Sequence, residues 1–453
     1  MAELLLGFRR IHLVGVGGAG MSGLARLLAG RGHLVSGSDA RPSATLDALA
    51  VEGVTTWFGH RPEEMADVEL VVASSAVRPE DPELQAAATR RIPVWDRPRL
   101  LAAITSTMPT IGPTGTHGKT STTAMLVAGA RAAGADPSFV VGGELLDLGT
   151  NAAAGTDDLL ILEVDEAFGT FEHVRLDGLI VTSVEEDHLD HFGDRAGLEE
   201  AFRRVVRAVD GPVYCCLDDA GAASVAADTG ALGYGFDSAA VWRIETFDEH
   251  PGGSSFALRG PDGFWQVRLP RPGRHMAQNA TGAIALLGAV GVDVEAAIGG
   301  LERFGGVGRR WQVRGEVGAT TVVDDYAHHP TEVAATLDGA RRFGRRLVAV
   351  FQPHLYSRTA MHADAFGVAL AKADAVVVLD VYGAREEPIT GVDGRLVSDA
   401  VRRAGGRAVF DAVDRTTAAD VVAQVVEDGD LVVCMGAGDI TELAGELLSR
   451  LER

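Results

Sequence analysis

The sequence has few cysteines and no long apolar run. Its three cysteines, Cys215, Cys216 and Cys434, form no CxxC pair and no even-numbered set, so we expect neither a structural zinc site nor a disulfide scaffold. No apolar run approaches the roughly 20 residues that a membrane-spanning helix needs. The first residues run straight into a strand pattern and do not resemble a secretory signal. We therefore expect a cytoplasmic protein without a membrane span.

Basic residues are scarce relative to acidic ones. The chain has 41 Lys and Arg against 63 Asp and Glu, a formal net charge of −22. This charge repels polyanions, which argues against nucleic acids and anionic membranes as partners. Hydrophobic residues make up 46% and charged residues 23%, a balance typical of folded proteins. Any phosphate ligand must be held by local groups.

The length of 453 residues favours two to four domains at about 100 to 200 residues each. Strand, turn and helix patterns restart near residue 108 and again near residue 305. We predict an α/β fold with three consecutive α/β domains: a Rossmann-like domain over 1–107, a P-loop ATPase-like central domain over 108–304, and a Rossmann-like domain over 305–453. The segment 246–270 is expected to form an antiparallel insertion. The sequence does not predict an oligomeric state.

A glycine-rich loop follows the first strand pattern. It has the GxGxxG spacing, and an aspartate ends the next strand; the residues are Gly15, Gly17, Gly18, Gly20 and Asp39. Glycines let the backbone approach a diphosphate, and Asp39 can accept a ribose hydroxyl. The alternative is a tight turn without a ligand. The loop does not distinguish NAD from a UDP-sugar.

A second loop, at 112–121, lies between a strand and a long helix. It departs from the strict GxxxxGK[ST] pattern because Pro113 occupies the position of the first glycine. Its glycines still permit a nest of backbone N–H groups, Lys119 can reach the outer phosphates of a nucleoside triphosphate, and the Thr120 hydroxyl can bind Mg²⁺. An NAD-dependent dehydrogenase has no use for such a loop, which weakens that alternative.

Carboxylates and histidines follow two strands of the central domain. Glu163 ends one strand and His188 follows the next. Side chains in these positions face the crevice where phosphates bind in an α/β domain, so the pair is predicted to hold Mg²⁺. The alternative is a set of solvated loop charges.

In the third region, polar clusters at 324–330 and 351–358 each end a strand and begin a helix. Their His, Tyr, Asp and Arg residues suit recognition of an anionic substrate and an amine. A histidine metal cluster is a weaker alternative, because adjacent histidines point in different directions.

Taken together, these blocks resemble the Mur ligases of peptidoglycan synthesis over nearly the whole chain. The blocks that carry the resemblance are GVGGAGMSGLA at 15–25, SSA at 74–76, GTHGKTS at 115–121, EVDE at 163–166, EDHLDHF at 186–192, VDDYAHHPTE at 323–332 and FQPHLYSRT at 351–359. The resemblance implies an ATP-dependent ligase that joins L-alanine to the carboxylate of UDP-N-acetylmuramate through an acyl phosphate, with Mg²⁺. The alternatives are a ligase that attaches a whole tripeptide and a UDP-sugar-binding paralogue with reduced activity.

The resemblance also implies roles for individual residues. Lys119, Glu163, His188, His328 and Arg358 are expected to serve catalysis, and Thr120, Glu163 and His188 to hold the metal. The residues expected to contact ATP are Gly115, Thr116, His117, Gly118, Lys119, Thr120, Ser121, Asn279, Arg309 or Arg310, and Asp324 or Asp325. Those expected to contact UDP-N-acetylmuramate or L-alanine are Gly15, Gly17, Gly18, Gly20, Asp39, Ser74, Ser75, Tyr326, His328 and Arg358.

Several positions depart from the family pattern, among them Ala167, which replaces a hydroxyl residue. Phe168 stands where members commonly have an acidic residue, Met276 where many have an asparagine, and Leu355 where they have an arginine. These departures leave the ATP and metal residues intact and bear on the acceptor substrate.

Overall fold

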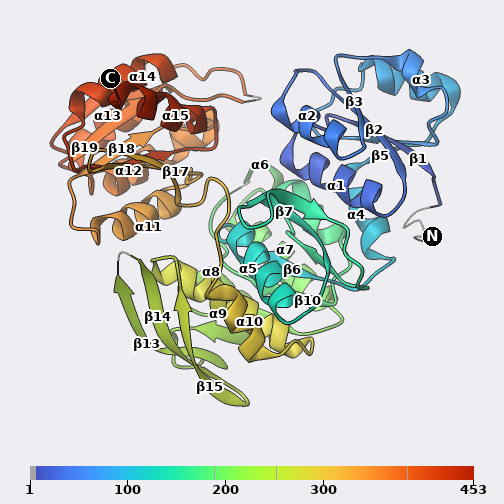
Figure 1. Ribbon diagram of the computed structural model, residues 1–453, viewed down its shortest axis with the longest axis horizontal. Helices are drawn as coiled ribbons and strands as arrows, with labels where there is room; N and C mark the ends of the chain where they lie inside the picture. Colours follow the sequence, from blue (N-terminus) through green and yellow to red (C-terminus); the bar gives the residue numbers. More distant parts are fainter. Residues whose placement is uncertain (1–6, 188, 251, 385, 453) are drawn as a thin grey trace. The chain divides into compact units, whose positions relative to one another are not determined.

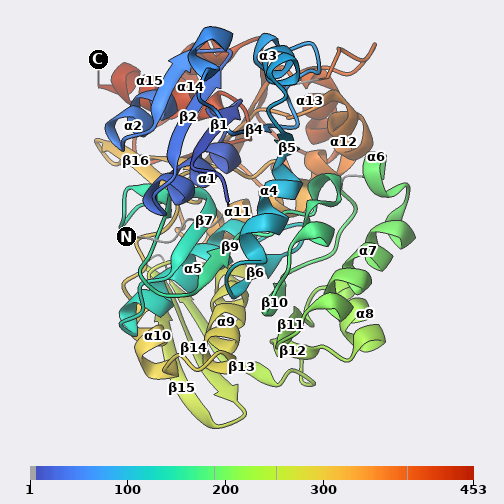
Figure 2. The same ribbon diagram turned by 90° about the vertical axis from the view of Figure 1, so that its right-hand side faces the viewer.

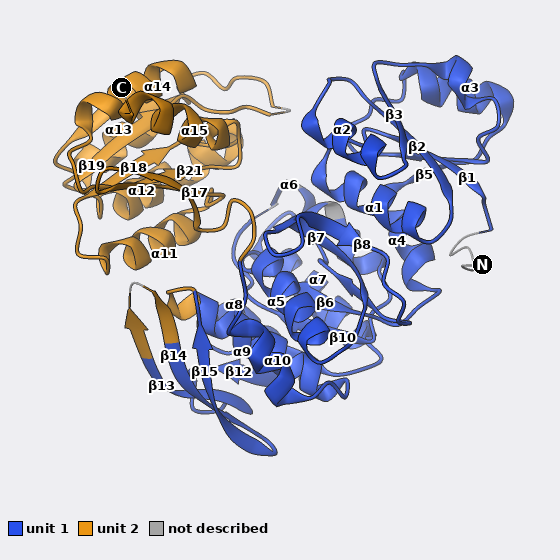
Figure 3. Cartoon of the chain, in the orientation of Figure 1, with its two compact units in different colours: residues 1–247, 255–270, 276–305 blue, residues 248–254, 271–275, 306–453 orange. Residues whose placement is uncertain are grey.

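The computed structural model describes residues 7–187, 189–250, 252–384 and 386–452 (Figure 1). The chain forms an α/β fold with three mainly parallel sheets. By its internal contacts it divides into two compact units, one of residues 1–247, 255–270 and 276–305 and the other of residues 248–254, 271–275 and 306–453 (Figure 3). Among the helices that the structure describes, none is long and apolar enough to cross a membrane.

The first sheet has five parallel strands in the order β3-β2-β1-β4-β5. Its strands are β1 (Arg10–Val14), β2 (Leu34–Asp39), β3 (Thr55–Phe58), β4 (Leu70–Ala73) and β5 (Val94–Asp96). The helical segments between and after them are α1 (Ala19–Gly30), α2 (Ala44–Val51), η1 (Pro62–Met65), α3 (Pro82–Arg90) and α4 (Arg97–Thr105). The glycine-rich loop connects β1, a central strand, to α1.

The second sheet has ten strands in the order β15-β14-β13-β12-β11-β10-β6-β9-β7-β8. Its strands are β6 (Thr110–Thr114), β7 (Ser138–Leu145), β8 (Thr150–Ala153), β9 (Leu160–Leu162), β10 (Gly178–Val181), β11 (Val213–Cys216), β12 (Leu232–Gly235), β13 (Trp242–His250), β14 (Gly253–Gly260) and β15 (Gly263–Leu269). Its helical segments are α5 (Lys119–Ala132), η2 (Ala167–His173), α6 (Leu189–Phe192), α7 (Arg195–Ala208), α8 (Ala220–Thr229), α9 (Arg274–Ala289) and α10 (Val294–Leu301). Strand β6 lies between β10 and β9 and is parallel to both.

Helix α1 of the first sheet packs on β7 of the second (Figure 2) and also on β8. Small residues make the close approach possible, since a Cβ on Gly23 would lie 3.0 Å from Cγ1 of Val140. The buried Asn151 of β8 donates to the carbonyl of Ala19 at 3.0 Å and accepts from Nη1 of Arg26 at 2.7 Å. Strands β7 and β8, which the sequence did not predict, therefore link the two sheets.

The third sheet has six strands in the order β16-β17-β21-β18-β19-β20, and only the edge strand β16 is antiparallel to its neighbour. Its strands are β16 (Gln312–Val317), β17 (Thr320–Asp325), β18 (Leu347–Phe351), β19 (Ala375–Leu379), β20 (Val409–Ala412) and β21 (Leu431–Met435). Its helices are α11 (Pro330–Arg341), α12 (Tyr356–Leu370), α13 (Gly394–Arg403), α14 (Arg415–Val425) and α15 (Ile440–Leu451). Strands β18, β19 and β21 are buried along their whole length, which explains why their sequences are continuously apolar.

Candidate functional site

The predicted phosphate loop connects the buried strand β6 to the start of α5. Its backbone turns through left-handed conformations at Gly115 and Gly118, where φ is +133° and +83°. A Cβ on Gly115 would lie 2.3 Å from Oγ1 of Thr182, and one on Gly118 would lie 2.8 Å from Oδ1 of Asn279. Any other residue at these two positions would both strain the backbone and clash with its neighbours.

Residues that follow β10 form hydrogen bonds with the phosphate loop. The backbone N–H of Thr116 donates to the carbonyl of Ser183 at 3.0 Å, and that of His117 donates to the Ser183 hydroxyl at 2.9 Å. The N–H of Glu185 donates to Oγ1 of Thr116 at 2.9 Å. Sequence reasoning did not select Thr182 or Ser183, because their only signal is their position after a strand.

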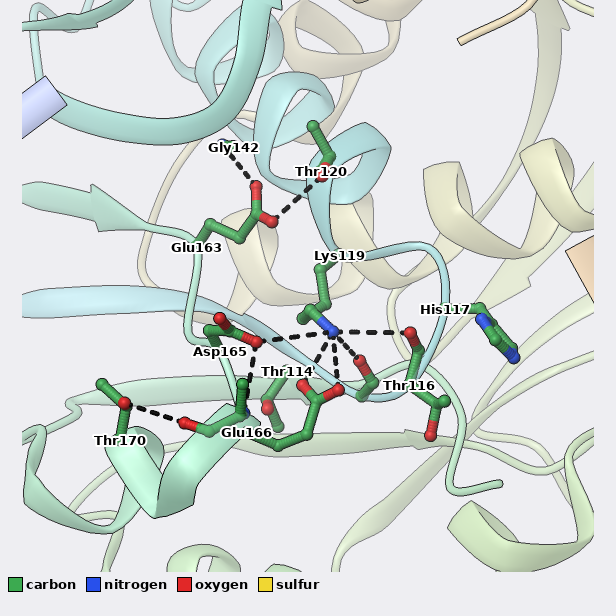
Figure 4. Close-up of polar contacts among 12 residues, drawn as sticks. Thr114, Thr116, His117, Lys119, Thr120, Gly142, Glu163, Asp165, Glu166 and Thr170 are labelled. Carbon is green, nitrogen blue, oxygen red and sulfur yellow. Dashed lines mark hydrogen bonds and ion pairs between the residues drawn. The ribbon is translucent and has the colours of Figure 1, made fainter. Parts of the chain in front are cut away.

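Lys119 points back into its own loop rather than outward (Figure 4). Its ammonium group donates to the carbonyl of Gly115 at 2.6 Å and to the two carboxylate oxygens of Glu166 at 2.7 and 2.9 Å. Asp165 lies 4.0 Å away. Burial opposes the charge on Lys119, but the attraction of Glu166 and Asp165 is larger in sum and raises its pKa. Lys119 therefore stays positively charged.

Glu163 reaches the start of α5 from the end of β9. Its Oε1 accepts from the hydroxyl of Thr120 at 3.0 Å, and its Oε2 accepts from the backbone N–H of Gly142 at 2.6 Å (Figure 4). A hydroxyl and a carboxylate thus lie together beside the phosphate loop, and both are oxygen donors of the kind that Mg²⁺ prefers. The predicted third ligand, His188, lies outside the described residues, as does the side chain of Phe168.

The remaining predicted ATP contacts of the central region surround this loop. Asn279 of α9 is buried and lies against Gly118. Nε2 of His117 is 3.6 Å from a carboxylate oxygen of Glu185. Ser121 is buried in the first turn of α5. The structure therefore brings together the residues predicted from 115–121 with Glu163 and Asn279.

The first glycine loop is also built by close approaches. A Cβ on Gly15, where φ is +81°, would lie 2.9 Å from Cβ of Ser74. The N–H of Gly17 donates to Oδ2 of Asp39 at 2.9 Å. Gly18 caps the N-terminus of α1. Ser74 is thus at the loop, whereas the next residue, Ser75, is exposed after β4.

In the second unit, Tyr326 lies near two guanidinium groups. The Cζ atoms of Arg309 and Arg310 are 4.7 and 5.0 Å from the centre of its ring. Nη2 of Arg309 donates to the carbonyls of Gly436 and Gly438 at 2.8 and 3.2 Å. Burial lowers the pKa of Arg309. The tyrosine ring orients both cations at the carboxyl end of β17.

The two adjacent aspartates at this strand end have different surroundings. Asp325 accepts backbone N–H groups from Trp311 and Ala327, both at 2.8 Å, and burial raises its pKa to about 6. Asp324 is fully buried, and its Oδ2 accepts from Oγ1 of Thr441 at 2.6 Å. Its Oδ1 has no hydrogen-bond partner among the described residues. Asp325 therefore fixes the local backbone, whereas one carboxylate oxygen of Asp324 makes no hydrogen bond to the described residues.

Two further predicted residues belong to the same end of the third sheet. Nδ1 of His328 is 3.0 Å from the carbonyl of Tyr326 and 3.2 Å from Oε2 of Glu332. This places the ring proton on Nδ1 and leaves Nε2 as the basic nitrogen. Arg358 is buried at the start of α12, and one of its nitrogens is 3.5 Å from Nδ1 of His354.

Fold and site together define an α/β protein whose loop between β6 and α5 has the glycines, lysine and threonine typical of phosphate binding. Three family profiles match the chain: Mur ligase family catalytic domain over residues 10–108, Mur ligase middle domain over 114–287, and Mur ligase glutamate ligase domain over 309–438. The chain belongs to the Mur ligase family.

Individual relatives agree with this assignment. The chain is 44% identical to the UDP-N-acetylmuramate--L-alanine ligase of Saccharopolyspora erythraea over 100% of this chain and 95% of that protein. It is 41% identical to the enzyme of the same name from Thermobifida fusca over 98% and 96%. Among solved structures, UDP-N-acetylmuramate-alanine ligase MurC from Thermotoga maritima has a TM-score of 0.83 and 26% identity over 97% of this chain and 98% of that one. A murein peptide ligase from Psychrobacter arcticus has a TM-score of 0.74, also at 26% identity, over 99% of each chain.

Proposed function

We propose that this chain is an ATP-dependent ligase that joins L-alanine to the carboxylate of UDP-N-acetylmuramate in the synthesis of peptidoglycan precursors. The observation that carries this proposal is the pairing of the Thr120 hydroxyl with the Glu163 carboxylate beside Lys119. The arrangement suits a triphosphate and its metal ion. The identity of the substrates is inferred from the names of the relatives that are 41 to 44% identical to this chain.

ATP is expected to bind at 115–121. The backbone N–H groups at the start of α5, where no side chain caps the helix, and the Lys119 ammonium group are expected to neutralise its phosphates. Asn279, which lies against Gly118, is expected to contact the adenine, and Asp324 or Asp325 the ribose. Arg309 and Arg310 are expected to contribute positive charge near the phosphates.

The donor set of Thr120 and Glu163 fits Mg²⁺, and the sequence adds His188 as a third ligand. When bound, the ion supplies charge neutralisation at the transferred phosphoryl group. Glu163 is already oriented for this role by the N–H of Gly142. A side chain that is held in place loses little freedom on binding a ligand.

The chemistry needs positioning and charge rather than a nucleophilic side chain. The muramoyl carboxylate attacks the γ-phosphorus of ATP, and ADP leaves; the amine of L-alanine then attacks the acyl phosphate, phosphate leaves, and an amide forms. The amine must lose a proton, which Nε2 of His328 can accept. Tyr326 and Arg358 are expected to bind the amino acid and the muramoyl carboxylate.

We also propose that the domain boundaries lie at 107/108 and 304/305. The first boundary is supported by the family match that ends at residue 108, and the second by the unmatched segment 288–308 that contains it. The protein is expected to act in the cytoplasm, where ATP is available.

The test is phosphate release from ATP in the presence of UDP-N-acetylmuramate and a panel of amines: L-alanine, glycine, L-serine and the tripeptide. We expect release to depend on L-alanine and on Mg²⁺, with the amide product seen by mass spectrometry. Release that requires the tripeptide would favour the recycling activity, and no release with any amine would favour a binding paralogue.

A further inference from the structure

Arg97 is a partly buried cation beside the glycine loop of the first sheet. It is the first residue of α4, and its side chain lies over Gly20 in the first turn of α1. A Cβ on Gly20 would lie 3.0 Å from Cζ and 3.1 Å from Nη2 of Arg97. The glycine at this position therefore provides the space that the guanidinium group occupies.

Within the part of the chain that the structure describes, this guanidinium group has no hydrogen-bond or ion-pair partner. Its Nε atom is buried. The adjacent Asp96 does not pair with it, because Oδ1 of Asp96 accepts the N–H of Arg99 at 2.8 Å and caps α4. Asp39, the carboxylate of the glycine loop, accepts from Gly17 and Arg41 instead.

The location is electrostatically unfavourable for a cation. The N-terminus of a helix carries the positive end of its dipole, and Arg97 is at the start of α4 and over the start of α1. Helix α1 has no acidic residue in its first turn, and no side chain caps its N-terminus at Gly18. An unpaired cation near two positive helix ends costs free energy, which an anion bound there would recover.

We propose that Arg97 binds the diphosphate of the UDP-sugar substrate, together with the backbone N–H groups at the start of α1. This inference rests on the proposed function and on the expectation from the sequence that UDP-N-acetylmuramate binds at the glycine loop, and it adds a side chain that neutralises the substrate's charge. The substrate's other anionic group is the muramoyl carboxylate. The diphosphate fits better, because the guanidinium group lies over the helix start, where phosphate oxygens bind.

Calorimetric titration of the unsubstituted protein, Arg97→Gln, Arg97→Lys and Arg99→Gln with UDP and with UDP-N-acetylmuramate tests the proposal. We expect Arg97→Gln to lower the affinity for both ligands by roughly 10- to 100-fold, the effect of losing a charged hydrogen bond. Arg97→Lys should lose less, because it keeps the charge but not the two-pronged geometry. Arg99→Gln is the matched control: Arg99 is exposed on the same helix, with Cζ 4.7 Å from the centre of the Trp95 ring, and its loss should leave both affinities unchanged.

Thermal unfolding without ligand separates binding from folding. Arg97→Gln should melt no lower than the unsubstituted protein, since it removes an unpaired cation. Unchanged UDP affinity, a loss confined to UDP-N-acetylmuramate, or a clearly lower melting temperature would each overturn the proposal. Protein that binds UDP through Arg97 but forms no amide would contradict the proposed function alone, whereas protein that binds neither ligand would overturn both.

Discussion

The ammonium group of Lys119 lies 2.7 Å from Oε2 of Glu166, a carboxylate that is only 2% exposed. The cation expected to bind ATP phosphates thus has an internal counter-ion forty-seven positions along the chain. A phosphate that reaches Lys119 must share the ammonium group with Glu166 or displace it. Glu166 therefore influences both the stability of the loop and the affinity for nucleotide.

We expect Glu166→Gln to destabilise the protein without nucleotide by about 3 kcal/mol or more, because removing one partner of a buried pair leaves an uncompensated charge. A non-hydrolysable ATP analogue with Mg²⁺ should recover part of this loss, since its phosphates replace the missing carboxylate. Urea denaturation with and without the analogue measures both effects. Asp165→Asn is the control, because Asp165 is 4.0 Å away and more exposed. Equal stabilisation by the analogue in Glu166→Gln and unsubstituted protein would contradict this account.

Lys119→Ala should abolish ligation and leave the affinity for UDP-N-acetylmuramate nearly unchanged. The physical reason is separation: the glycine loop follows β1 of the first sheet, and the phosphate loop follows β6 of the second. Steady-state rates and calorimetric titration provide the two measurements. Lys372→Ala, which removes only a surface ion pair with Asp338, should change neither. Loss of UDP-N-acetylmuramate binding in Lys119→Ala would mean that the two sites are not independent.

Glu163→Gln and Thr120→Val should each raise the Mg²⁺ concentration needed for half-maximal rate by roughly tenfold or more and lower turnover by orders of magnitude, because phosphoryl charge is then poorly neutralised. The sequence predicts the same for His188→Ala. Rates measured over a Mg²⁺ titration test this. Glu172→Gln, a carboxylate paired with Arg204 at 3.0 Å, is the matched control. An unchanged Mg²⁺ dependence in both Glu163→Gln and Thr120→Val would remove these residues from the metal site.

The local parts of the phosphate loop were predictable from sequence. The spacing of Gly115, Gly118, Lys119 and Thr120 directly specifies a turn followed by a helix start. The partners of the loop were not predictable, because Ser183 and Glu166 are distant in sequence and reach it only through the strand order β10-β6-β9. Non-local contacts of this kind depend on which strands are neighbours, and no local pattern encodes that.

The sequence also could not distinguish between candidate residues that are adjacent in the chain. Asp324 and Asp325 look alike in the sequence, and only their hydrogen bonds distinguish them: Asp325 accepts two backbone N–H groups, whereas Oδ1 of the buried Asp324 has no partner among the described residues. Strands β7 and β8 were missed because their glycines and polar residues weaken the strand pattern. Their partners are distant in sequence, since β7 pairs with β9 and α1 packs against β7 and β8.

The pH dependence of stability should depend on Glu83, which is fully buried in the first sheet domain. Burial would raise its pKa, but hydrogen bonds, from His12 above all and also from the N–H of Arg61, Ser38 and Trp57, outweigh this and lower the pKa from 4.5 to about 2. A lowered carboxyl pKa contributes stability that is complete above the unfolded pKa and lost as the pH falls through the folded one. The shift corresponds to about 3 kcal/mol.

We therefore expect the difference in unfolding free energy between the unsubstituted protein and Glu83→Gln to be constant above about pH 5 and to shrink between pH 4.5 and 2. Denaturant titrations at several pH values measure it. Glu69→Gln serves for comparison: the backbone N–H groups of Arg10 and Arg9 also lower the pKa of that carboxyl, but it lies at the surface, where solvent screening should make its pH-dependent difference smaller. A difference that does not change with pH would show that the charge of Glu83 does not contribute to the free energy of unfolding.

L-alanine should be the preferred acceptor, with glycine and L-serine as slower substrates. A pocket that holds one methyl group discriminates against its absence by about 10- to 200-fold, and it rejects an added hydroxyl by a comparable factor. Specificity constants for the three amino acids and for the tripeptide test this ranking. A clear preference for the tripeptide would overturn the assignment of L-alanine.

Phe168→Asp tests whether the departure at this position sets that ranking. The family resemblance implies a carboxylate at the position where this chain has Phe168, and a ring cannot replace the charged hydrogen bonds that a carboxylate makes with an amine or a hydroxyl. Such a bond contributes about 1.5 to 3 kcal/mol, enough to shift specificity constants by roughly tenfold or more. If Phe168 faces a substrate, Phe168→Asp should therefore change the order or spacing of the three amino acids while the protein stays folded. If the ring instead fills the core, the same substitution should lower the melting temperature and leave the ratios of the specificity constants as they were.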